Sequence, residues 1–247
     1  MALLSVEHLT RRFGGVVALD DVSFDVPDGQ ILGLIGPNGA GKTTAFNVIT
    51  RLYKPDSGRV VYDGQDLLKV APYDIVRRGI ARTFQNVELF KRMTVLENVL
   101  VGAHSTTEWF READGRRRAL EALELTGIAD LSGRVASALP FATLKRIELA
   151  RALVSRPNLL LLDEPAGGLS HEEVHEFGDF LVKLRGDLDL TVLLVEHHMG
   201  LVMRVSQTVH VLDFGKLIAS GTPDDVQADP AVIEAYLGVE EDDDGAA

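Results

Sequence analysis

The chain has 247 residues, of which 46% are hydrophobic and 25% charged, as expected for a globular protein of one domain or one domain with an insertion. Its 25 Lys and Arg against 37 Asp and Glu give a formal charge of −12, which argues against a nucleic-acid-binding surface. The absence of cysteine excludes disulfides and thiolate metal sites. No hydrophobic run approaches the about 18 residues of a membrane-spanning helix, and the N-terminus predicts no signal peptide.

The first 65 residues alternate short hydrophobic runs with turn signals, which predicts a largely antiparallel β region. The expected strands cover residues 3–9, 16–26, 31–35 and 59–62. The last strand ends at Asp63-Gly64, and Asp-Gly after a β-branched run is a strong hairpin signal. The run at 31–35 leads into a glycine-rich loop and then into a helix expected at about 42–52.

The pattern changes twice in the rest of the chain. Hydrophobic residues recur at helical spacing between residue 86 and about 156, which predicts a helical lobe inserted into the sheet domain. Continuous hydrophobic runs at 159–162 and 191–195, separated by a helical segment, predict buried parallel strands. The elements expected after these are a strand at 209–212, a turn at Phe214-Gly215 and small helices within 221–238. The acidic tail from Glu240 has few groups to bury and is expected to be disordered.

Residues 36–43 match the phosphate-loop pattern G-x-x-x-x-G-K-[ST] without a mismatch, between a predicted strand and a predicted helix. Glycines allow backbone N–H groups to close around a phosphate, and the helix that follows presents its positive end. Lys42 is then expected to bridge β- and γ-phosphate oxygens, and the Thr43 hydroxyl to take a place on Mg²⁺. The alternative, a glycine-rich turn that happens to contain Lys-Thr, is disfavoured by the context on both sides. The expected phosphate contacts come from Gly36, Pro37, Asn38, Gly39, Ala40, Gly41, Lys42, Thr43 and Thr44.

Polar side chains follow three further predicted strands. Asp163 and Glu164 come directly after one of them, and Gln85 and His197 after two others. Because ligands bind at the carboxyl ends of parallel strands, we expect all four to face the phosphate loop. Asp163 and Gln85 are therefore candidates for holding Mg²⁺. Glu164 is the candidate general base, and His197 is the candidate to hydrogen-bond the γ-phosphate. Taken alone, Gln85 or His197 is more commonly a simple polar cap of a strand, and Asp163-Glu164-Pro165 could equally well be a solvated turn at the strand exit.

These residues resemble the ATP-binding cassette (ABC) ATPase family over the whole chain except its acidic tail. Gln85 falls at the family's Q-loop, Asp163 and Glu164 at its Walker B motif, and His197 at its switch histidine. A closer similarity, to the ATPase subunits of branched-chain amino acid importers (Liv-type), lies in residues 82–86, 89–102 and 195–199. Residues 13–19 look like the family's adenine-contacting turn, which implies that Phe13 stacks on the base. The alternative is that Phe13 is an ordinary half-buried strand residue.

The resemblance implies an α/β fold of the P-loop NTPase type, with a RecA-like parallel sheet core, an antiparallel β subdomain and an inserted α-helical subdomain. The ATP-binding domain is expected at 1–239, its helical subdomain at about 86–156, and the tail at 240–247. The resemblance further implies that the chain binds ATP and Mg²⁺, pairs with a second ABC ATPase subunit as a homo- or heterodimer, and hydrolyses ATP to drive an integral membrane permease. The implied location is the cytoplasmic face of the cell membrane, and the implied cargo is branched-chain or other hydrophobic amino acids.

One family motif differs in this chain. Where the family usually reads Leu-Ser-Gly-Gly-Gln, a signature loop that contacts the γ-phosphate held by the other subunit, residues 139–143 read Leu-Pro-Phe-Ala-Thr. Pro140 offers neither a hydroxyl nor an N–H, and Ala142 is strained wherever a glycine would adopt a positive φ. The segment at the family's D-loop position, residues 166–170, ends in Ser170, where the family usually has Asp or Asn.

These departures keep a second function open. The chain is alternatively a nucleotide-binding regulatory or structural subunit whose degenerate signature loop leaves the partner's site inactive. A third alternative, an ABC ATPase without a permease that acts on ribosomes or DNA, is disfavoured because such chains usually carry tandem cassettes and this one has a single phosphate loop.

Overall fold

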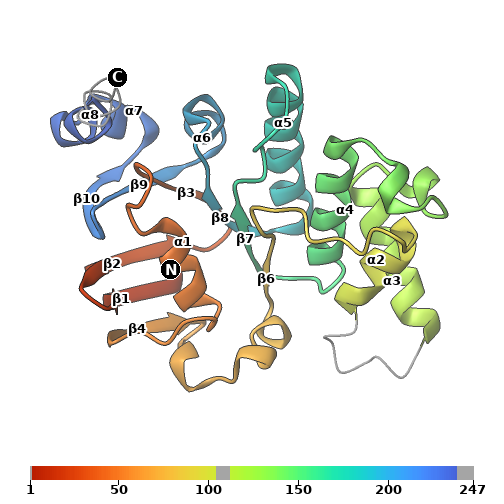
Figure 1. Ribbon diagram of the computed structural model, residues 1–247, viewed down its shortest axis with the longest axis horizontal. Helices are drawn as coiled ribbons and strands as arrows, with labels where there is room; N and C mark the ends of the chain where they lie inside the picture. Colours follow the sequence, from red (N-terminus) through yellow and green to blue (C-terminus); the bar gives the residue numbers. More distant parts are fainter. Residues whose placement is uncertain (1, 104–111, 238–247) are drawn as a thin grey trace. The chain divides into compact units, whose positions relative to one another are not determined.

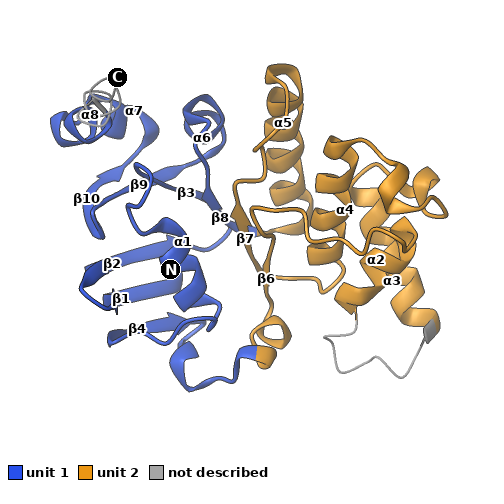
Figure 2. Ribbon diagram, viewed as in Figure 1, with its two compact units in different colours: residues 1–72, 191–247 blue, residues 73–190 orange. Residues whose placement is uncertain are grey.

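The protein, seen as a computed structural model, is described for residues 2–103 and 112–237. The chain divides into two compact units, which Figure 2 colours separately. Unit 1 comprises residues 1–72 and 191–247, and unit 2 comprises residues 73–190. Unit 1 is therefore built from the two ends of the chain, and unit 2 from its middle.

An antiparallel sheet in unit 1 has the strand order β2-β1-β4-β5. Its strands are β1 (Ala2–Phe13), β2 (Val16–Pro27), β4 (Ser57–Tyr62) and β5 (Gln65–Asp66). Side chains alternate between faces, so that Val60 and Tyr62 of β4 are buried while Val61 between them is not. The predicted hairpin is confirmed, because Asp63 and Gly64 form a two-residue loop with φ of 45° and 71° and Tyr62 pairs with Gln65.

The second sheet region of unit 1 is mainly parallel. Strand β3 (Ile31–Ile35) lies between β8 (Thr191–Val195) and β9 (Thr208–Asp213) and is parallel to both, and β10 (Lys216–Gly221) joins β9 antiparallel. Every residue of β3 and β8 is buried, which explains their continuous hydrophobic runs. The helices are α1 (Lys42–Ile49), α6 (Met199–Val205), α7 (Pro223–Ala228) and α8 (Pro230–Leu237). Helix α1 is shorter than predicted, because Arg51 takes a left-handed φ of 64° just after the Thr50 cap.

Unit 2 combines a parallel strand pair with helices. Strand β6 (Ile80–Arg82) is parallel to β7 (Leu159–Asp163), and helix α5 (His171–Leu188) follows β7. A reciprocal capping box between Ser170 and Glu173 starts α5. Figure 1 shows the other helices of this unit side by side: α2 (Val95–Ala103), α3 (Glu112–Leu125) and α4 (Phe141–Leu153). Short 3₁₀ turns occur at Leu67–Lys69, Pro72–Asp74, Val76–Arg78, Ala129–Leu131 and Ala136–Ala138.

The first helix after residue 86 is α2, which starts at Val95, and residues 86–94 are irregular. Buried Asn98 supports this irregular segment, because its side chain accepts from the Phe90 N–H at 2.8 Å and donates to the carbonyls of Phe90 and Thr94. The limits 1–239 and 86–156 stay predictions, and the tail at 240–247 lies outside the described residues.

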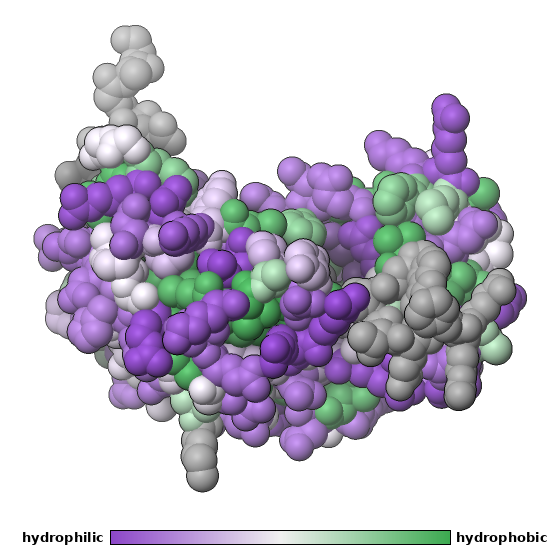
Figure 3. Space-filling view, turned by 90° about the horizontal axis from the view of Figure 1, so that it is seen from below, coloured by the Kyte–Doolittle hydropathy of each residue, from purple (hydrophilic) through white to green (hydrophobic). Residues whose placement is uncertain are grey.

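The surface is largely polar on the face shown in Figure 3, where hydrophobic residues lie in patches between the hydrophilic ones. Within 2–103 and 112–237, no helix has both the length and the apolar character needed to cross a bilayer.

Candidate active site

The phosphate loop in unit 1 follows β3 and has a backbone that only glycine can adopt at two points. Gly36 has a φ of 149°, and a Cβ atom there would lie 2.0 Å from the carbonyl oxygen of Leu212. Gly41 has a φ of 104°, and its Cβ would lie 2.4 Å from the carbonyl oxygen of Ala18. These glycines therefore allow both the turn and the close approach of neighbouring backbone.

Lys42 is the first residue of α1, and its side chain is folded back over the loop. The residue is 6% exposed, and its Nζ donates to the carbonyls of Gly36 at 2.6 Å and Pro37 at 2.8 Å. The cap residue of α1, Gly41, provides no side-chain hydrogen bond to this helix, and no acidic residue lies in the first turn. A buried cation beside the positive N-terminal end of a helix suits an anion such as a phosphate.

His197 belongs to the same unit, after β8. Parallel pairing places Leu34 of β3 opposite Val195 of β8, so the phosphate loop and His197 begin at the same edge of the sheet. His197 is exposed, and its N–H donates to the buried carboxylate of Glu196 at 2.9 Å. Glu196 also accepts from the N–H of His198, so it shapes the turn that presents His197.

Asp163 lies at the end of β7 in unit 2 with its side chain 3% exposed. One carboxylate oxygen, Oδ2, accepts from the Arg82 guanidinium at 2.8 Å, and the other, Oδ1, is buried with no hydrogen-bond partner among the described residues. An unpaired buried carboxylate oxygen is costly unless a donor or a cation satisfies it. This oxygen therefore fits the expected role of Asp163 toward Mg²⁺ or one of its bound waters.

Glu164 follows Asp163 with a left-handed φ of 47°, which turns the chain out of the strand. Its Oε2 accepts from Nε2 of Gln85 at 2.7 Å, and Gln85 itself follows β6. The structure thus brings together Gln85 and Glu164, which are 79 residues apart in sequence, with Asp163 adjacent. The phosphate loop and His197 are placed in unit 1, and these three residues in unit 2.

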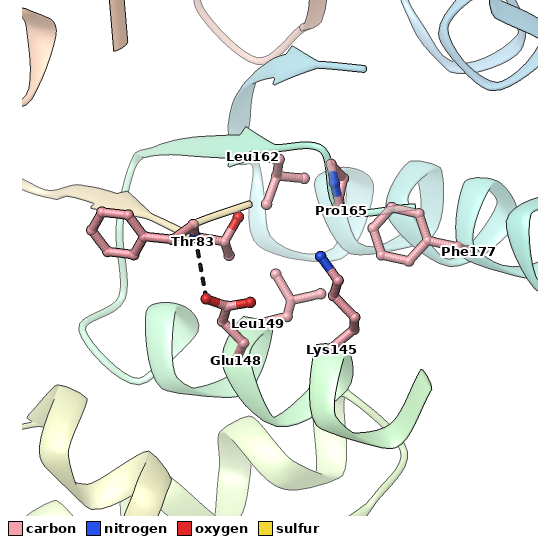
Figure 4. Close-up of a pocket in the computed structure, with 8 residues that line it drawn as sticks. Thr83, Lys145, Glu148, Leu149, Leu162, Pro165 and Phe177 are labelled. Atoms are coloured by element: carbon pink, nitrogen blue, oxygen red, sulfur yellow. Dashed lines mark hydrogen bonds between the residues drawn. The ribbon is translucent and has the colours of Figure 1, made fainter. Parts of the chain in front are cut away.

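Helix α4 contributes residues that the sequence analysis missed. Buried Lys145 donates from Nζ to the carbonyls of Gln85 at 3.0 Å and Glu164 at 3.2 Å. Buried Glu148 accepts from the N–H of Phe84 at 3.2 Å, and burial raises the pKa of this carboxyl. The sequence contains a signal for these buried charges, because Lys145 and Glu148 lie on the same helical face as hydrophobic Leu149, where a core residue is expected. Figure 4 shows Lys145, Glu148 and Leu149 lining one small pocket with Thr83 and Leu162.

The signature segment forms the start of α4. Pro140 is the helix cap and makes no capping hydrogen bond through its side chain. Ala142 is the second residue of the helix and is not among the residues with positive φ, so the condition under which strain was expected at Ala142 is not met in this structure. The ring of Phe141 packs on the D-loop, where a Cβ atom on Gly168 would lie 2.8 Å from it.

Phe13 ends β1 and is 39% exposed. Its ring lies edge-on to Tyr53 with 5.2 Å between centroids, and the Arg11 guanidinium lies 4.5 Å above it. The exposed remainder of the ring leaves room for stacking, and the predicted contact with adenine stays a prediction.

Comparisons with known proteins identify the family of the chain. Residues 19–167 match the family "ABC transporter", and residues 216–242 match "Branched-chain amino acid ATP-binding cassette transporter". The high-affinity branched-chain amino acid transport ATP-binding protein BraF of Pseudomonas aeruginosa is 41% identical, with 96% of this chain and 98% of that protein covered. The corresponding protein LivG of Escherichia coli K12 is 42% identical over the same shares.

Solved structures show the same fold. A nucleotide-free ATP-binding cassette from an ABC transporter is 32% identical, with a TM-score of 0.86 and coverage of 96% of this chain and 99% of that one. A cassette in its ADP conformation has the same identity, TM-score and coverage. A bacterial cassette in a dimeric structure is 25% identical, with a TM-score of 0.80, covering 89% and 98% of the two chains. The α/β fold class and the family resemblance are thus confirmed, and the chain belongs to the ABC transporter family as one of its nucleotide-binding ATPase cassettes.

Proposed function

We propose that this chain hydrolyses ATP to power an importer of branched-chain amino acids. The observation that carries this proposal is the match at 216–242 to the branched-chain cassette family, because it lies outside the general ABC match at 19–167. Relatives with branched-chain amino acid transport in their names, at 41–42% identity over 96% of the chain, support the same assignment.

The phosphate loop is the proposed binding site for the phosphates of ATP. Backbone N–H groups of the loop, which every residue of 36–44 except Pro37 carries, and the positive end of α1 would hold phosphate oxygens, and Lys42 would exchange carbonyl contacts for phosphate contacts. Support comes from its buried ammonium, which is 2.6 Å from the Gly36 carbonyl and needs anionic or polar partners. Phe13 is the proposed stacking partner of adenine.

Asp163, Gln85 and Thr43 are the proposed residues for Mg²⁺. Support comes from the unpaired buried Oδ1 of Asp163 and from the donor set, since carboxylate, amide and hydroxyl oxygens are ligands that Mg²⁺ or its waters accept. Mg²⁺, when bound, would neutralise charge on the phosphates.

Glu164 is the proposed general base. Its carboxylate accepts a proton from a water whose oxygen forms a bond to the γ-phosphorus, while the bond from that phosphorus to the β–γ bridging oxygen breaks. The products are ADP and inorganic phosphate. Gln85 orients the carboxylate through the 2.7 Å hydrogen bond, and His197 is proposed to hydrogen-bond the γ-phosphate.

The proposed partners are a second ABC ATPase subunit and an integral membrane permease, which would place the chain at the cytoplasmic face of the cell membrane. A dimeric solved structure of a similar cassette supports the first partner. The relatives named as transport ATP-binding proteins support a membrane permease as the second partner. An ATP-binding subunit needs another protein to provide the path for its cargo.

Turnover of the purified full chain tests the proposed chemistry. We expect Glu164→Gln to lower kcat by about 100-fold or more with ATP affinity retained, because only the proton acceptor is lost. Glu172→Gln, at an exposed position at the start of α5, is the matched control and should keep wild-type kcat. Unchanged turnover in Glu164→Gln would contradict the role of Glu164.

Transport tests the cargo. The chain is purified with its membrane partner, reconstituted into vesicles, and assayed for ATP-dependent uptake of leucine, isoleucine and valine against lysine. Uptake of none of the three branched-chain amino acids would contradict the proposed cargo. No ATP hydrolysis with any partner would favour the regulatory subunit considered from the signature loop.

A further inference from the structure

Lys145 on helix α4 places a cation beside Gln85 and Glu164, the residues to which the proposed function assigns metal binding and proton transfer. Lys145 is 8% exposed, and its Nζ donates to the backbone carbonyls of Gln85 at 3.0 Å and of Glu164 at 3.2 Å. In Figure 4 its amino group points away from α4, toward Pro165 and Leu162 on the segment that contains Glu164. One ammonium group thus ties together two backbone segments that are far apart in sequence.

The strand pairing ends before Gln85 and Glu164, so the contacts of Lys145 are needed to hold these two backbone segments together. Strands β6 and β7 are held by parallel pairing up to Arg82, opposite Leu161, and by the Thr83 N–H to the Leu161 carbonyl. Beyond these bonds the two backbones are no longer paired as strands, yet the side chains of Gln85 and Glu164 must stay within the 2.7 Å that separates them. Lys145 replaces the missing ladder bonds at this point.

The same face of α4 holds the backbone on both sides of Gln85. Glu148 accepts from the N–H of Phe84 at 3.2 Å, and Arg151 donates to the carbonyl of Glu88 and lies 3.7 Å from Glu148. These side chains are three residues apart along the helix, so they line one face. The contacts are to backbone atoms, which means that they fix the path of the chain without using the side chain of Gln85, which donates to Glu164.

We infer that Lys145 is a positioning residue for ATP hydrolysis, which holds Gln85 and Glu164 at the separation that the reaction needs. This inference rests on the proposed function, because it assumes that Glu164 is the base. If Lys145 only stabilised the fold, its loss would lower the unfolding temperature and leave kcat of the folded protein unchanged. If Lys145 positions Gln85 and Glu164, its loss also lowers kcat of the folded protein.

The test compares three full-length variants for kcat, for KM of ATP and for unfolding temperature. Lys145→Met keeps the aliphatic stem and removes the donors, and Lys145→Arg keeps a cation with several N–H donors. Lys183→Met, at an exposed lysine of α5 in the same unit, is the control. We expect Lys145→Met to lower kcat by about 10- to 100-fold with KM within about twofold, because the phosphate loop is untouched. Lys145→Arg should recover most of the lost kcat, and Lys183→Met should match the wild type.

A second comparison separates positioning from general stability. In a Glu164→Gln background, Lys145→Met should lower the residual turnover by less than about twofold, because the group that it positions no longer accepts a proton. An equally large loss with and without Glu164 would overturn the inference. Equal losses of kcat in Lys145→Met and Lys145→Arg would also overturn it, because packing volume and not N–H donation would then matter.

Failure of the proposed function gives different kcat values from failure of the inference about Lys145. If Glu164→Gln keeps wild-type kcat, the base assignment is wrong, and the inference falls with it. If Glu164→Gln is inactive while folded Lys145→Met keeps wild-type kcat, only the inference is wrong. Should Lys145→Met unfold below the assay temperature, Lys145→Leu, which also lacks N–H donors, replaces it. Wild-type kcat in folded Lys145→Leu assigns Lys145 to stability alone and overturns the inference.

Discussion

The phosphate loop and the Q-loop segment at 84–94 are both irregular, but they are held in opposite ways. The phosphate loop is shaped by its own glycines and by Lys42, which bonds to carbonyls five and six residues before it. The Q-loop segment contains no glycine and is held by side chains from α2 and α4, up to 64 residues away in sequence.

This difference determines which substitutions destabilise each region. In the phosphate loop, backbone conformation and close backbone packing limit which residues fit, so adding a single Cβ atom is expected to be harmful. In the Q-loop segment, many residues fit the backbone, and the supporting side chains are limiting because each satisfies backbone groups that would otherwise lose their partners. Variants of the two kinds can be compared by the free energy of unfolding.

The largest effect is expected for Gly36→Ala. Its Cβ would lie 2.0 Å from the Leu212 carbonyl oxygen at a φ of 149°, so both a clash and strain arise, and we expect a loss of about 3 kcal/mol or more. Gly39→Ala is the matched control, because Gly39 has a φ of 80° but no atom within 4 Å of the added Cβ. It should lose only the conformational part, about 1–2 kcal/mol. Urea unfolding measures both, and equal losses would show that close packing does not limit this loop.

A smaller effect is expected for Asn98→Ala in α2. Asn98 is fully buried, and its side chain bonds the N–H and the carbonyl of Phe90 and the carbonyl of Thr94. Removing it leaves these groups without that partner, at a cost of about 1–3 kcal/mol. Asn86→Ala, at an exposed position in the same segment, should change the free energy of unfolding by no more than about 0.5 kcal/mol. If the two asparagines were equivalent in urea unfolding, the Q-loop segment would not depend on Asn98.

The same contrast explains what could be predicted from the sequence. The phosphate loop, the Asp63-Gly64 hairpin and the buried runs of β3, β7 and β8 depend on short segments and their patterns, and all appear where expected. The residues at strand ends were predictable because parallel strands bring their carboxyl ends to one edge, as His197 after β8 illustrates.

What was missed depends on contacts across long separations. The bonds from Lys145 to Gln85 and from Arg82 to Asp163 join residues 60 and 81 positions apart, and no local pattern encodes them. Strain at Ala142 was expected only for a backbone with the positive φ of a glycine. The residue lies instead in the first turn of α4, where alanine fits well.

The smallest effect, which depends on pH, is expected for Glu148→Gln in α4. Burial raises the pKa of Glu148 above its ordinary value of 4.5, although the Phe84 N–H, Arg151 and Lys145 oppose the shift and Glu88 adds to it. The folded state therefore binds this proton more tightly than the unfolded state does. The stability that the protonated carboxyl contributes is present below the unfolded pKa and is lost as pH rises through the folded pKa.

Glutamine keeps the oxygen that accepts from Phe84 and cannot ionise, so the unfolding free energy of Glu148→Gln should gain on the wild type as pH rises from about 5 to about 8. The gain should be smaller than the loss in Asn98→Ala. Glu124→Gln, at an exposed position on α3, controls for the removal of one negative charge. A difference that instead favours the wild type as pH rises would mean that Lys145 and Arg151 stabilise the carboxylate by more than burial costs it. The Q-loop segment would then be held by an ion-paired carboxylate on α4, and its support would weaken, not strengthen, on acidification.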